Sequence, residues 1–315
     1  MSYNFSEVTF PSADGKTTVY GEIYTPKNRS SVGIVQISHG MIDHIGRYKN
    51  LINYLTENGY VVAGNHHLGH GRSIVSESEY GFFAEKGGVD ILLSDLHEMN
   101  RILRYQFPTL PLILLGHSMG SFLARLYAVE YSHTVKGVII HGTSGPNPAA
   151  GAGALLASLI SATKGTHHRS KLLHSLSIGA YLKKFPSEGS LGWLTREVSQ
   201  VADRETDPYT QFAFSASAFG DLFTMLRAAN KKDWYKKYPK NIPALVMSGD
   251  ADPVGDFGRG VRTVYKNLLM AGAEVSLKLY EGARHELFNE TNREEVFADI
   301  LEWLGTVVEK SRFTF

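Results

Sequence analysis

The sequence contains no cysteine, which excludes disulfide bonds, a thiol nucleophile and cysteine metal sites. It also lacks an excess of either charge, since it contains 32 Lys and Arg residues and 31 Asp and Glu residues. A chain with a formal net charge of +1 has no overall field that attracts nucleic acid. We therefore predict no nucleic-acid partner, and the lack of cysteine fits a reducing compartment.

Long hydrophobic runs are missing as well. Residues 1–7 show neither the basic stretch nor the apolar stretch of a signal peptide. The longest apolar stretch near the middle, residues 152–162, is too short to span a bilayer and is interrupted by Ser158 and Ser161. We predict a cytoplasmic protein.

What the sequence does contain is a regular alternation of strand-like and helix-like segments. Apolar runs typical of strands alternate with amphipathic segments, which favours a mostly parallel α/β sheet covered by helices on both faces. Predicted strands are 7–10, 18–24, 32–38, 60–63, 112–115, 135–140, 244–248 and 275–280, the first two as a hairpin. Predicted helices are 48–58, 90–105, 121–131, 260–271 and 293–309.

The alternation stops between residues 145 and 231. This stretch has no pattern of a buried strand and contains helix-like pieces at 154–162, 171–185 and 208–229. We predict a core formed by residues 1–144 and 232–315 and an inserted helical cap formed by residues 145–231. Residues 231–238 mix lysine with aromatic residues, and we predict a solvated loop that returns the chain to the core.

Residues 112–120 hold the central motif, Leu-Ile-Leu-Leu-Gly-His-Ser-Met-Gly. A strand that runs into Gly-x-Ser-x-Gly and then a helix is typical of a nucleophile elbow, where a sharp turn exposes the serine hydroxyl. Gly116 and Gly120 supply the space that this turn needs. Ser118 is therefore the predicted nucleophile.

A serine hydroxyl needs a base that takes its proton and a third group that orients the base. His285 follows the last predicted strand, and three carboxylates, Asp250, Asp252 and Asp256, follow the strand before it. We predict the order Ser118, Asp252, His285, with Asp250 bonding turn amides and Asp256 capping the next helix. The carboxyl ends of parallel strands share one sheet edge, so these residues can converge there.

Two backbone amides are candidates for the oxyanion hole. The amide after the nucleophile belongs to Met119, and the loop after the 32–38 strand offers Met41, with Ile42 as the alternative from the same loop.

Four motifs in order carry a family resemblance. They are residues 38–48 (Ser-His-Gly-Met-Ile-Asp-His-Ile-Gly-Arg-Tyr), 65–73 (Asn-His-His-Leu-Gly-His-Gly-Arg-Ser), 116–120 and 282–285 (Gly-Ala-Arg-His). The chain resembles the monoacylglycerol lipase and lysophospholipase branch of the α/β-hydrolases, related to the S33 serine aminopeptidases. It departs from the family's Asp-His-Arg-Gly-His-Gly pattern, because His66 and Leu68 replace the acid and the base.

The resemblance implies an α/β-hydrolase fold with a helical lid and a Ser-His-Asp carboxylic ester hydrolase. The implied substrate is a small-molecule ester with one acyl chain, cleaved through an acyl-serine intermediate without metal or organic cofactor. An aminopeptidase-like amide hydrolase is the alternative, and it needs an acidic group in the cap, for which the candidates are Asp203, Glu205, Asp207 and Asp221. A non-catalytic binding protein on the same scaffold ranks last, because all three predicted triad members are present.

Two further features concern partners. His66, His67, His70 and the pair His167–His168 lack metal-ligand spacing, so we predict no metal site. Between Lys164 and Arg196 the sequence has six basic residues and one acid, Glu188, which leaves open a transient contact of the cap with lipid surfaces. The sequence gives no oligomeric state.

Overall fold

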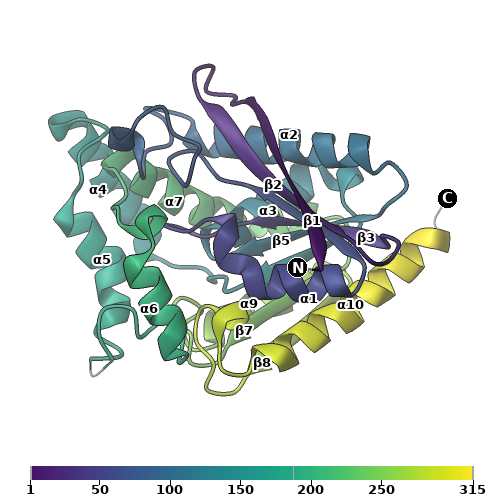
Figure 1. Cartoon of the computed structure of the whole chain (residues 1–315). Helices are drawn as coiled ribbons and strands as arrows, with labels where there is room; N and C mark the ends of the chain where they lie inside the picture. Colours follow the sequence, from purple (N-terminus) through teal and green to yellow (C-terminus); the bar gives the residue numbers. More distant parts are fainter. Residues whose placement is uncertain (1, 187, 314–315) are drawn as a thin grey trace.

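Within residues 2–186 and 188–313, which the computed structural model describes, eight strands form one sheet in the order β1-β2-β4-β3-β5-β6-β7-β8 (Figure 1). β1 and β2 form the predicted hairpin, β2 pairs antiparallel with β4, and all other neighbours are parallel. The strands are β1 (Tyr3–Pro11), β2 (Thr18–Pro26), β3 (Gly33–Ser38), β4 (Tyr60–Asn65), β5 (Leu112–His117), β6 (Gly137–His141), β7 (Ala244–Gly249) and β8 (Val275–Tyr280).

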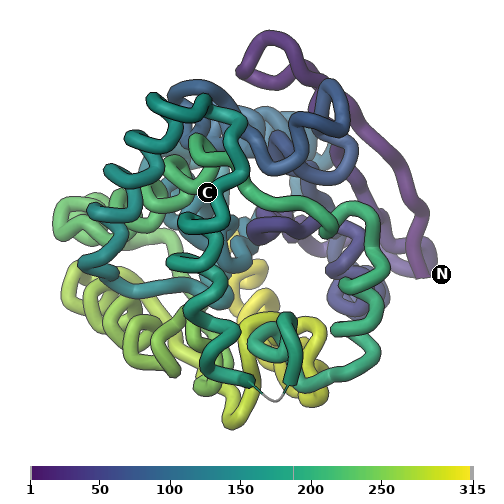
Figure 2. Tube along the Cα trace, turned by 90° about the vertical axis from the view of Figure 1, so that its left-hand side faces the viewer, coloured from purple at the N-terminus to yellow at the C-terminus, as the bar shows by residue number. Residues whose placement is uncertain are grey.

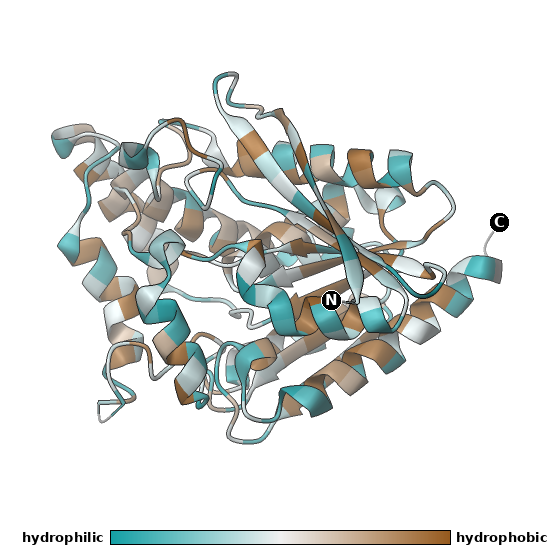
Figure 3. Ribbon diagram, in the orientation of Figure 1, coloured by the Kyte–Doolittle hydropathy of each residue, from teal (hydrophilic) through white to brown (hydrophobic). Residues whose placement is uncertain are grey.

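Helices cover both faces of this sheet. Successive side chains of a strand point to opposite faces, so the apolar strands present two apolar faces that need to be buried. In β5, Leu114 packs into a cluster with residues of α2, α3 and α9, whereas Ile113 and Leu115 pack into a second cluster with α1 and α10. Figure 3 shows the central strands as mostly hydrophobic, as expected of strands buried on both faces. The covering helices are α1 (Lys49–Glu57), α2 (Gly88–Gln106), α3 (Met119–Glu130), α9 (Arg259–Met270) and α10 (Arg293–Phe313).

Residues 145–231, here called the insertion, form helices grouped at one end of the sheet (Figures 1 and 2). Helix α7 packs against α2 and α3 of the core and also against α4. The single helix predicted over 208–229 is wrong in part: a short 3₁₀ turn comes first, and α7 begins only after Ser215, whose Oγ accepts the Ala218 N–H at 3.1 Å. The helices are α4 (Ala149–Lys164), α5 (Lys171–Leu182), α6 (Val198–Thr206), the 3₁₀ turn η4 (Pro208–Thr210) and α7 (Ala216–Ala229).

The two ends of the insertion meet at a small polar cluster, here called the neck, formed by Arg125, Ser144 and Asn230. The Ser144 carbonyl accepts hydrogen bonds from Arg125 Nη1 and from Asn230 Nδ2, both at 3.2 Å. Arg125 Nη2 also donates to Asn230 Oδ1 at 3.1 Å, and the Arg125 side chain is fully buried. The entry and exit of the insertion are therefore fixed to each other and to α3.

The prediction of a solvated return loop at residues 231–238 is wrong. Helix α8 (Lys232–Lys237) forms there, and Trp234, Tyr235 and Tyr238 are buried in the core cluster. Trp234 Nε1 donates to the Arg125 carbonyl at 2.8 Å. The aromatic side chains pack against the core, and the lysines between them face solvent, because the segment is an amphipathic helix.

No helix in the described ranges is both long and apolar enough to cross a membrane.

Candidate active site

Ser118 lies in the sharp turn between β5 and α3. Its φ of 54° places a non-glycine residue in a sparsely populated region, as a nucleophile elbow requires. No side chain fits at either flanking glycine. A Cβ on Gly116 would lie 2.2 Å from the Gly120 oxygen, and one on Gly120 would lie 2.0 Å from the Ser38 oxygen. The turn thus keeps Ser118 half-buried at the edge of the sheet.

His285 and Asp252 lie together beyond the ends of β8 and β7. His285 Nδ1 is 2.9 Å from Asp252 Oδ2, and both side chains are buried. Asp252 also accepts from the Ser248 hydroxyl at 3.1 Å and from the Val254 N–H at 2.8 Å. These bonds fix the carboxylate, which in turn fixes the orientation of the imidazole ring.

The nucleophile turn and His285 meet at the end of β6. The Ser118 N–H donates to the His141 carbonyl at 3.0 Å. The first residue after β6, Gly142, lies against the base, because a Cβ there would lie 3.1 Å from His285 Cε1. The ring of His117, directly before the serine, is 4.9 Å from the His285 ring. The structure therefore gathers Ser118, Asp252 and His285 at one sheet edge.

The other two acids of the β7 loop lie elsewhere. Asp250 Oδ1 accepts the Gly282 N–H at 2.7 Å, in agreement with the predicted turn role. The prediction that Asp256 caps α9 is wrong, because the N-cap is Gly258 and Asp256 pairs at the surface with Arg259 at 2.8 Å. Two residues with positive φ, Asp256 and Phe257, delay the start of the helix.

The loop after β3 presents its amides in different directions. The Gly40 N–H points at Asp43 Oδ2 at 3.4 Å, and the Ile42 N–H donates to His70 Nε2 at 3.2 Å. Met119 is the first residue of α3, where N–H groups have no partner inside the helix. The Met41 N–H, by contrast, makes no hydrogen bond within the described residues, so it is available to a substrate oxygen.

The remaining histidines of the 65–73 motif support loops. His66 Nε2 contacts Glu22 Oε1 on β2 at 3.1 Å, and its Nδ1 accepts the Arg72 N–H at 3.0 Å. The His66–Glu22 contact thus joins this loop to β2. In the described ranges no group of three or more His, Asp or Glu side chains is arranged to hold a metal ion.

Trp193 is a residue of the site that sequence reasoning missed. Its buried ring lies 5.1 Å from the His285 ring, between centroids. Two hydrogen bonds join residues 193–195 to the loop after His285. The Glu286 N–H donates to the Leu194 carbonyl and the Thr195 hydroxyl donates to the Asn289 carbonyl, each at 2.7 Å. The sequence around Trp193 has no periodic pattern, so the tryptophan itself was the signal that could have drawn attention to this segment.

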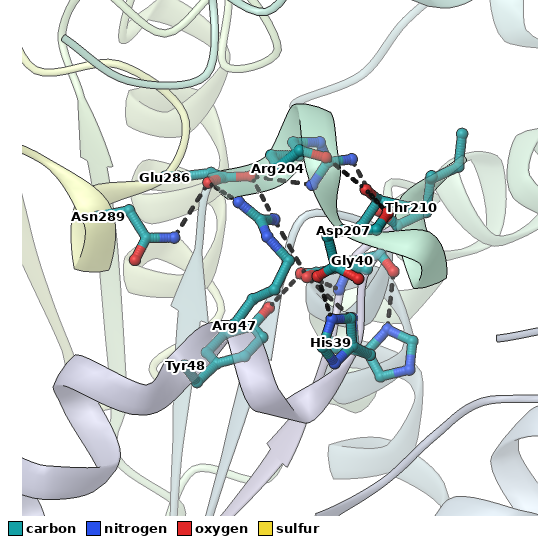
Figure 4. A network of polar contacts seen from close by, with 12 residues as sticks. His39, Gly40, Arg47, Tyr48, Arg204, Asp207, Thr210, Glu286 and Asn289 are labelled. Atoms are coloured by element: carbon teal, nitrogen blue, oxygen red, sulfur yellow. Dashed lines mark hydrogen bonds and ion pairs between the residues drawn. The ribbon is translucent and has the colours of Figure 1, made fainter. Parts of the chain in front are cut away.

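A buried ion network adjoins the site (Figure 4). Arg47 donates to both carboxylate oxygens of Glu286, at 2.9 and 2.7 Å, and pairs with Asp43 at 3.2 Å. Burial alone would raise the pKa of Glu286, but the neighbouring Arg47 and Arg204 outweigh it and lower that pKa to about 2. Burial would raise the pKa of Asp43 as well, but Arg47 and His117 hold it well below its usual range. The acids therefore stay ionised beside the catalytic candidates.

Comparison of the sequence with family models identifies the family of this chain. The model of the serine aminopeptidase S33 family matches residues 29–292. The chain belongs to this family. Among relatives, the monoacylglycerol lipase of Mycolicibacterium smegmatis is 27% identical over 314 residues, covering 96% of this chain and 98% of that protein. The human monoglyceride lipase is 29% identical over 297 residues, covering 89% of this chain and 83% of that protein.

Solved structures agree with this assignment. A thermostable carboxyl esterase from Bacillus coagulans, in complex with glycerol, superposes with a TM-score of 0.90 at 31% identity, covering 96% of this chain and 99% of that chain. The predicted α/β-hydrolase fold is confirmed, and this member of the S33 family is a carboxylic ester hydrolase.

Proposed function

We propose that this enzyme cleaves carboxylic esters that carry a single acyl chain, of the monoacylglycerol or lysophospholipid type. The buried Asp252–His285 hydrogen bond beside the strained Ser118 turn is the observation that carries the proposal. It is the pairing that makes a serine nucleophilic, because the carboxylate holds the ring with its other nitrogen free to accept a proton.

In the proposed reaction, Ser118 Oγ attacks the ester carbonyl carbon while His285 Nε2 takes the hydroxyl proton. The carbonyl oxygen becomes an oxyanion, stabilised by the N–H groups of Met41 and Met119. The tetrahedral intermediate collapses as the imidazolium gives its proton to the departing alcohol, which leaves an acyl-serine. A water molecule, deprotonated by His285, then releases the fatty acid and restores Ser118.

Residues 145–231 act in this proposal as a cap over the acyl chain. Trp193 lies over His285, and Tyr181 packs against Trp193 with 5.2 Å between ring centroids. An aromatic roof suits one acyl chain and excludes bulky triacylglycerols. The names of the relatives support this class, since they include monoglyceride lipases and the Bacillus subtilis phospholipase YtpA, which is 26% identical over 276 residues.

The acids of the insertion argue against an amine substrate. Asp207 Oδ2 is taken by His44 Nε2 at 2.6 Å, and Asp221 lies against the start of α2, where a Cβ on Gly88 would be 2.1 Å from its Oδ2. Asp203 and Glu205 are exposed on α6. The acidic group that an aminopeptidase needs is therefore not assembled from these four residues, and ester cleavage is the better proposal.

We also propose that the outer face of the insertion contacts lipid surfaces. Two leucine pairs one helical turn apart are more than half exposed, Leu155 and Leu159 on α4 and Leu172 and Leu176 on α5. Exposed lysines accompany them on the same segment: Lys164, Lys171, Lys183 and Lys184. Exposed leucines beside lysines suit an anionic membrane interface.

The test of the catalytic proposal combines labelling with turnover. A fluorophosphonate probe should label Ser118, and Ser118→Ala should abolish labelling and lower turnover of monoacylglycerol by roughly 10⁶-fold. Monoacylglycerol and lysophospholipid should be hydrolysed faster than triacylglycerol or aminoacyl amides. Near-normal hydrolysis by Ser118→Ala would refute the assignment of the nucleophile.

A further inference from the structure

Ile42 has an unusual backbone conformation beside the proposed oxyanion hole. Its φ is 52°, and a β-branched side chain in the left-handed region is strained. Such a conformation persists only where the surrounding structure holds it in place. The Met41 N–H belongs to the peptide that joins Gly40 to Met41, one residue before Ile42, so contacts that fix Ile42 restrict the loop backbone that carries this N–H.

Two hydrogen bonds hold Ile42, one at each of its backbone polar groups. On one side, the Ile42 N–H donates to His70 Nε2 at 3.2 Å. His70 Nδ1 lies 2.9 Å from the Leu68 carbonyl, where it must donate, so Nε2 is free to accept. On the other side, the Ile42 carbonyl accepts from Arg204 Nη2 at 2.7 Å. His70 belongs to the core, whereas Arg204 lies on α6 of the insertion.

Arg204 also contacts the segment that carries His285. Its Nη1 lies 3.3 Å from Glu286 Oε1, and Glu286 directly follows His285. Figure 4 shows the side chains of Arg204 and Arg47 converging on Glu286. The guanidinium of Arg204 thus bridges the loop after β3 and the loop after β8, which supply different parts of the proposed site.

Burial makes this bridge stronger than a surface contact. The side chain of Arg204 is 11% exposed and that of Glu286 is 4% exposed. Burial and the adjacent Arg47 lower the pKa of Arg204, while Glu286 and Asp43 oppose that shift. The two arginines and two acids balance in charge, so the bond from Arg204 to the Ile42 carbonyl is a charge-assisted one in a largely dry environment.

A second contact from the insertion holds the same loop. Asp207, just beyond α6, contacts His44 Nε2 at 2.6 Å, two residues after Ile42. The segment 204–207 therefore touches the β3 loop at two points.

We propose that Arg204 is a positioning residue for the ester hydrolysis. It holds Ile42 in the left-handed conformation that aims the Met41 N–H at the developing oxyanion, and it does not touch the substrate. The oxyanion hole is thus complete only while α6 is docked on the core. This inference rests on the proposed function, because it requires the oxyanion hole assigned above.

The experiment compares Arg204→Met with the wild-type enzyme on a water-soluble p-nitrophenyl ester. A donor displaced by about 1 Å costs up to roughly 10²-fold in rate, so kcat should fall about 10- to 100-fold while KM changes little. A trifluoromethyl ketone inhibitor forms an oxyanion with the same donors, so its affinity should fall by a factor similar to that of kcat/KM. A purely structural role would lower the melting temperature without this parallel loss.

Arg169→Met is the matched control. Arg169 is another arginine of the insertion, and its Nη2 donates to core-loop carbonyls, those of Ser78 at 3.0 Å and of Tyr80. No proposed catalytic residue lies in that loop, so kcat and inhibitor affinity should match the wild type. Arg204→Lys keeps the charge but cannot donate in the forked geometry to both partners, so its kcat should lie between those of Arg204→Met and wild type.

Two results would overturn the inference: a wild-type kcat in Arg204→Met, or equal losses in Arg204→Met and Arg169→Met. If Arg204→Met does not fold, Arg204→Lys decides, and wild-type kcat and inhibitor affinity in that variant would refute the inference. Absence of fluorophosphonate labelling at Ser118 in the wild-type enzyme would instead refute the proposed function, so the two failures are distinguishable.

Discussion

Helices α3 and α4 are both rich in apolar residues, yet the protein buries them very differently. Nine of the twelve residues of α3 are buried, against two of the sixteen of α4. Leu155 and Leu159 on α4 are 64% and 55% exposed, whereas Leu123 on α3 is fully buried. Figure 3 shows hydrophobic residues on α4 and α5 as well as on the strands. The apolar residues of α3 contribute packing, whereas Leu155 and Leu159 on α4 are available for contacts outside the protein.

The polar groups of the core and of the insertion differ as well. In the core, buried histidines and carboxylates form hydrogen bonds that a local change disrupts, whereas the polar contacts between the insertion and the core include arginines such as Arg204 and the half-buried acid Asp221. Perturbing the core site should therefore have the largest effect on catalysis, and perturbing the insertion should have smaller effects on rate, on lipid binding or on stability at alkaline pH.

The largest expected effect comes from the core carboxylate. Asp252→Asn should lower kcat by about 10⁴-fold, because an amide favours the wrong imidazole tautomer of His285. Asp250→Asn is the matched control, two residues away, and should cost only about 1 kcal/mol of stability through its bond to Gly282. Steady-state kinetics with a p-nitrophenyl ester would distinguish them. A large kcat loss at Asp250 in place of Asp252 would show that the acid is misassigned.

Acid should destabilise the core through its buried imidazoles. His67 and His70 are fully buried, and burial lowers the pKa of His67 to about 3 and that of His70 to about 4. In the unfolded chain these rings gain a proton near pH 6.5, so the unfolded chain binds more protons between pH 6.5 and 4. Stability must then fall as pH falls, by about 3 kcal/mol for His70 alone at pH 4.

Urea unfolding between pH 7 and pH 4 measures this slope. His70→Gln removes one titrating ring and should flatten it, while glutamine can still accept the Ile42 N–H. A free energy of unfolding that stays constant from pH 7 to pH 4.5 would contradict the prediction.

Alkaline pH should weaken the contact between the insertion and the core through Asp221. Burial raises the pKa of this α7 carboxyl to about 7. In the unfolded chain it loses its proton near pH 3.8, so the folded chain binds more protons between pH 3.8 and 7. The stability that this group contributes is present at low pH and lost as pH rises through about 7.

Asp221→Asn cannot titrate and should be more stable than wild type at pH 8, by on the order of 1–2 kcal/mol, with little difference near pH 4. The exposed Asp203→Asn serves as the control and should change neither value. Thermal unfolding at the two pH values provides the measurement, and an Asp221→Asn variant no more stable than wild type at pH 8 would count against it.

The smallest effect is expected on the outside of the insertion. The double variant Leu155→Ser and Leu159→Ser should bind anionic phospholipid vesicles about tenfold more weakly, because two exposed leucines lose apolar contact with the interface. Hydrolysis of a water-soluble ester should stay unchanged. Sedimentation with vesicles measures the binding, and unaltered binding would argue against a lipid contact through α4.

Sequence patterns predicted the turn around Ser118 and the loops of Asp252 and His285, because there the residues that the proposed chemistry needs stand in a recognisable local pattern. The elbow around Ser118 needs glycine on both sides, and the β7 and β8 loops place Asp252 and His285 by strand order alone. Helix α6 was missed, because it has few apolar residues and contacts the core through ionic and polar groups such as Arg204. The pairing of Arg204 with Ile42 joins positions that are 162 residues apart, and no local pattern encodes it.

Two other predictions were wrong, one in the loop between β7 and α9 and one directly after the insertion. Asp256 has the residue type of an N-cap, but two positive-φ residues shift the start of α9 to Gly258. Lysines at residues 231–238 suggested a solvated loop, although the aromatic residues between them are buried against α3. At residues 231–238 tertiary packing outweighed local preference, and before α9 the backbone conformation of two residues did; sequence spacing alone reports neither.

The neck has a consequence for how such enzymes diversify. Arg125, Ser144 and Asn230 join both ends of the insertion to one point on α3. The insertion is therefore a segment whose two ends are fixed to the core. Its helices can be lengthened, shortened or exchanged without altering the order or the register of the sheet strands. Substrate range can then evolve separately from the chemistry as long as Arg204 of α6 stays docked, so a graft that keeps Arg204 and the three neck residues is the natural starting point for testing the acyl preference of this hydrolase.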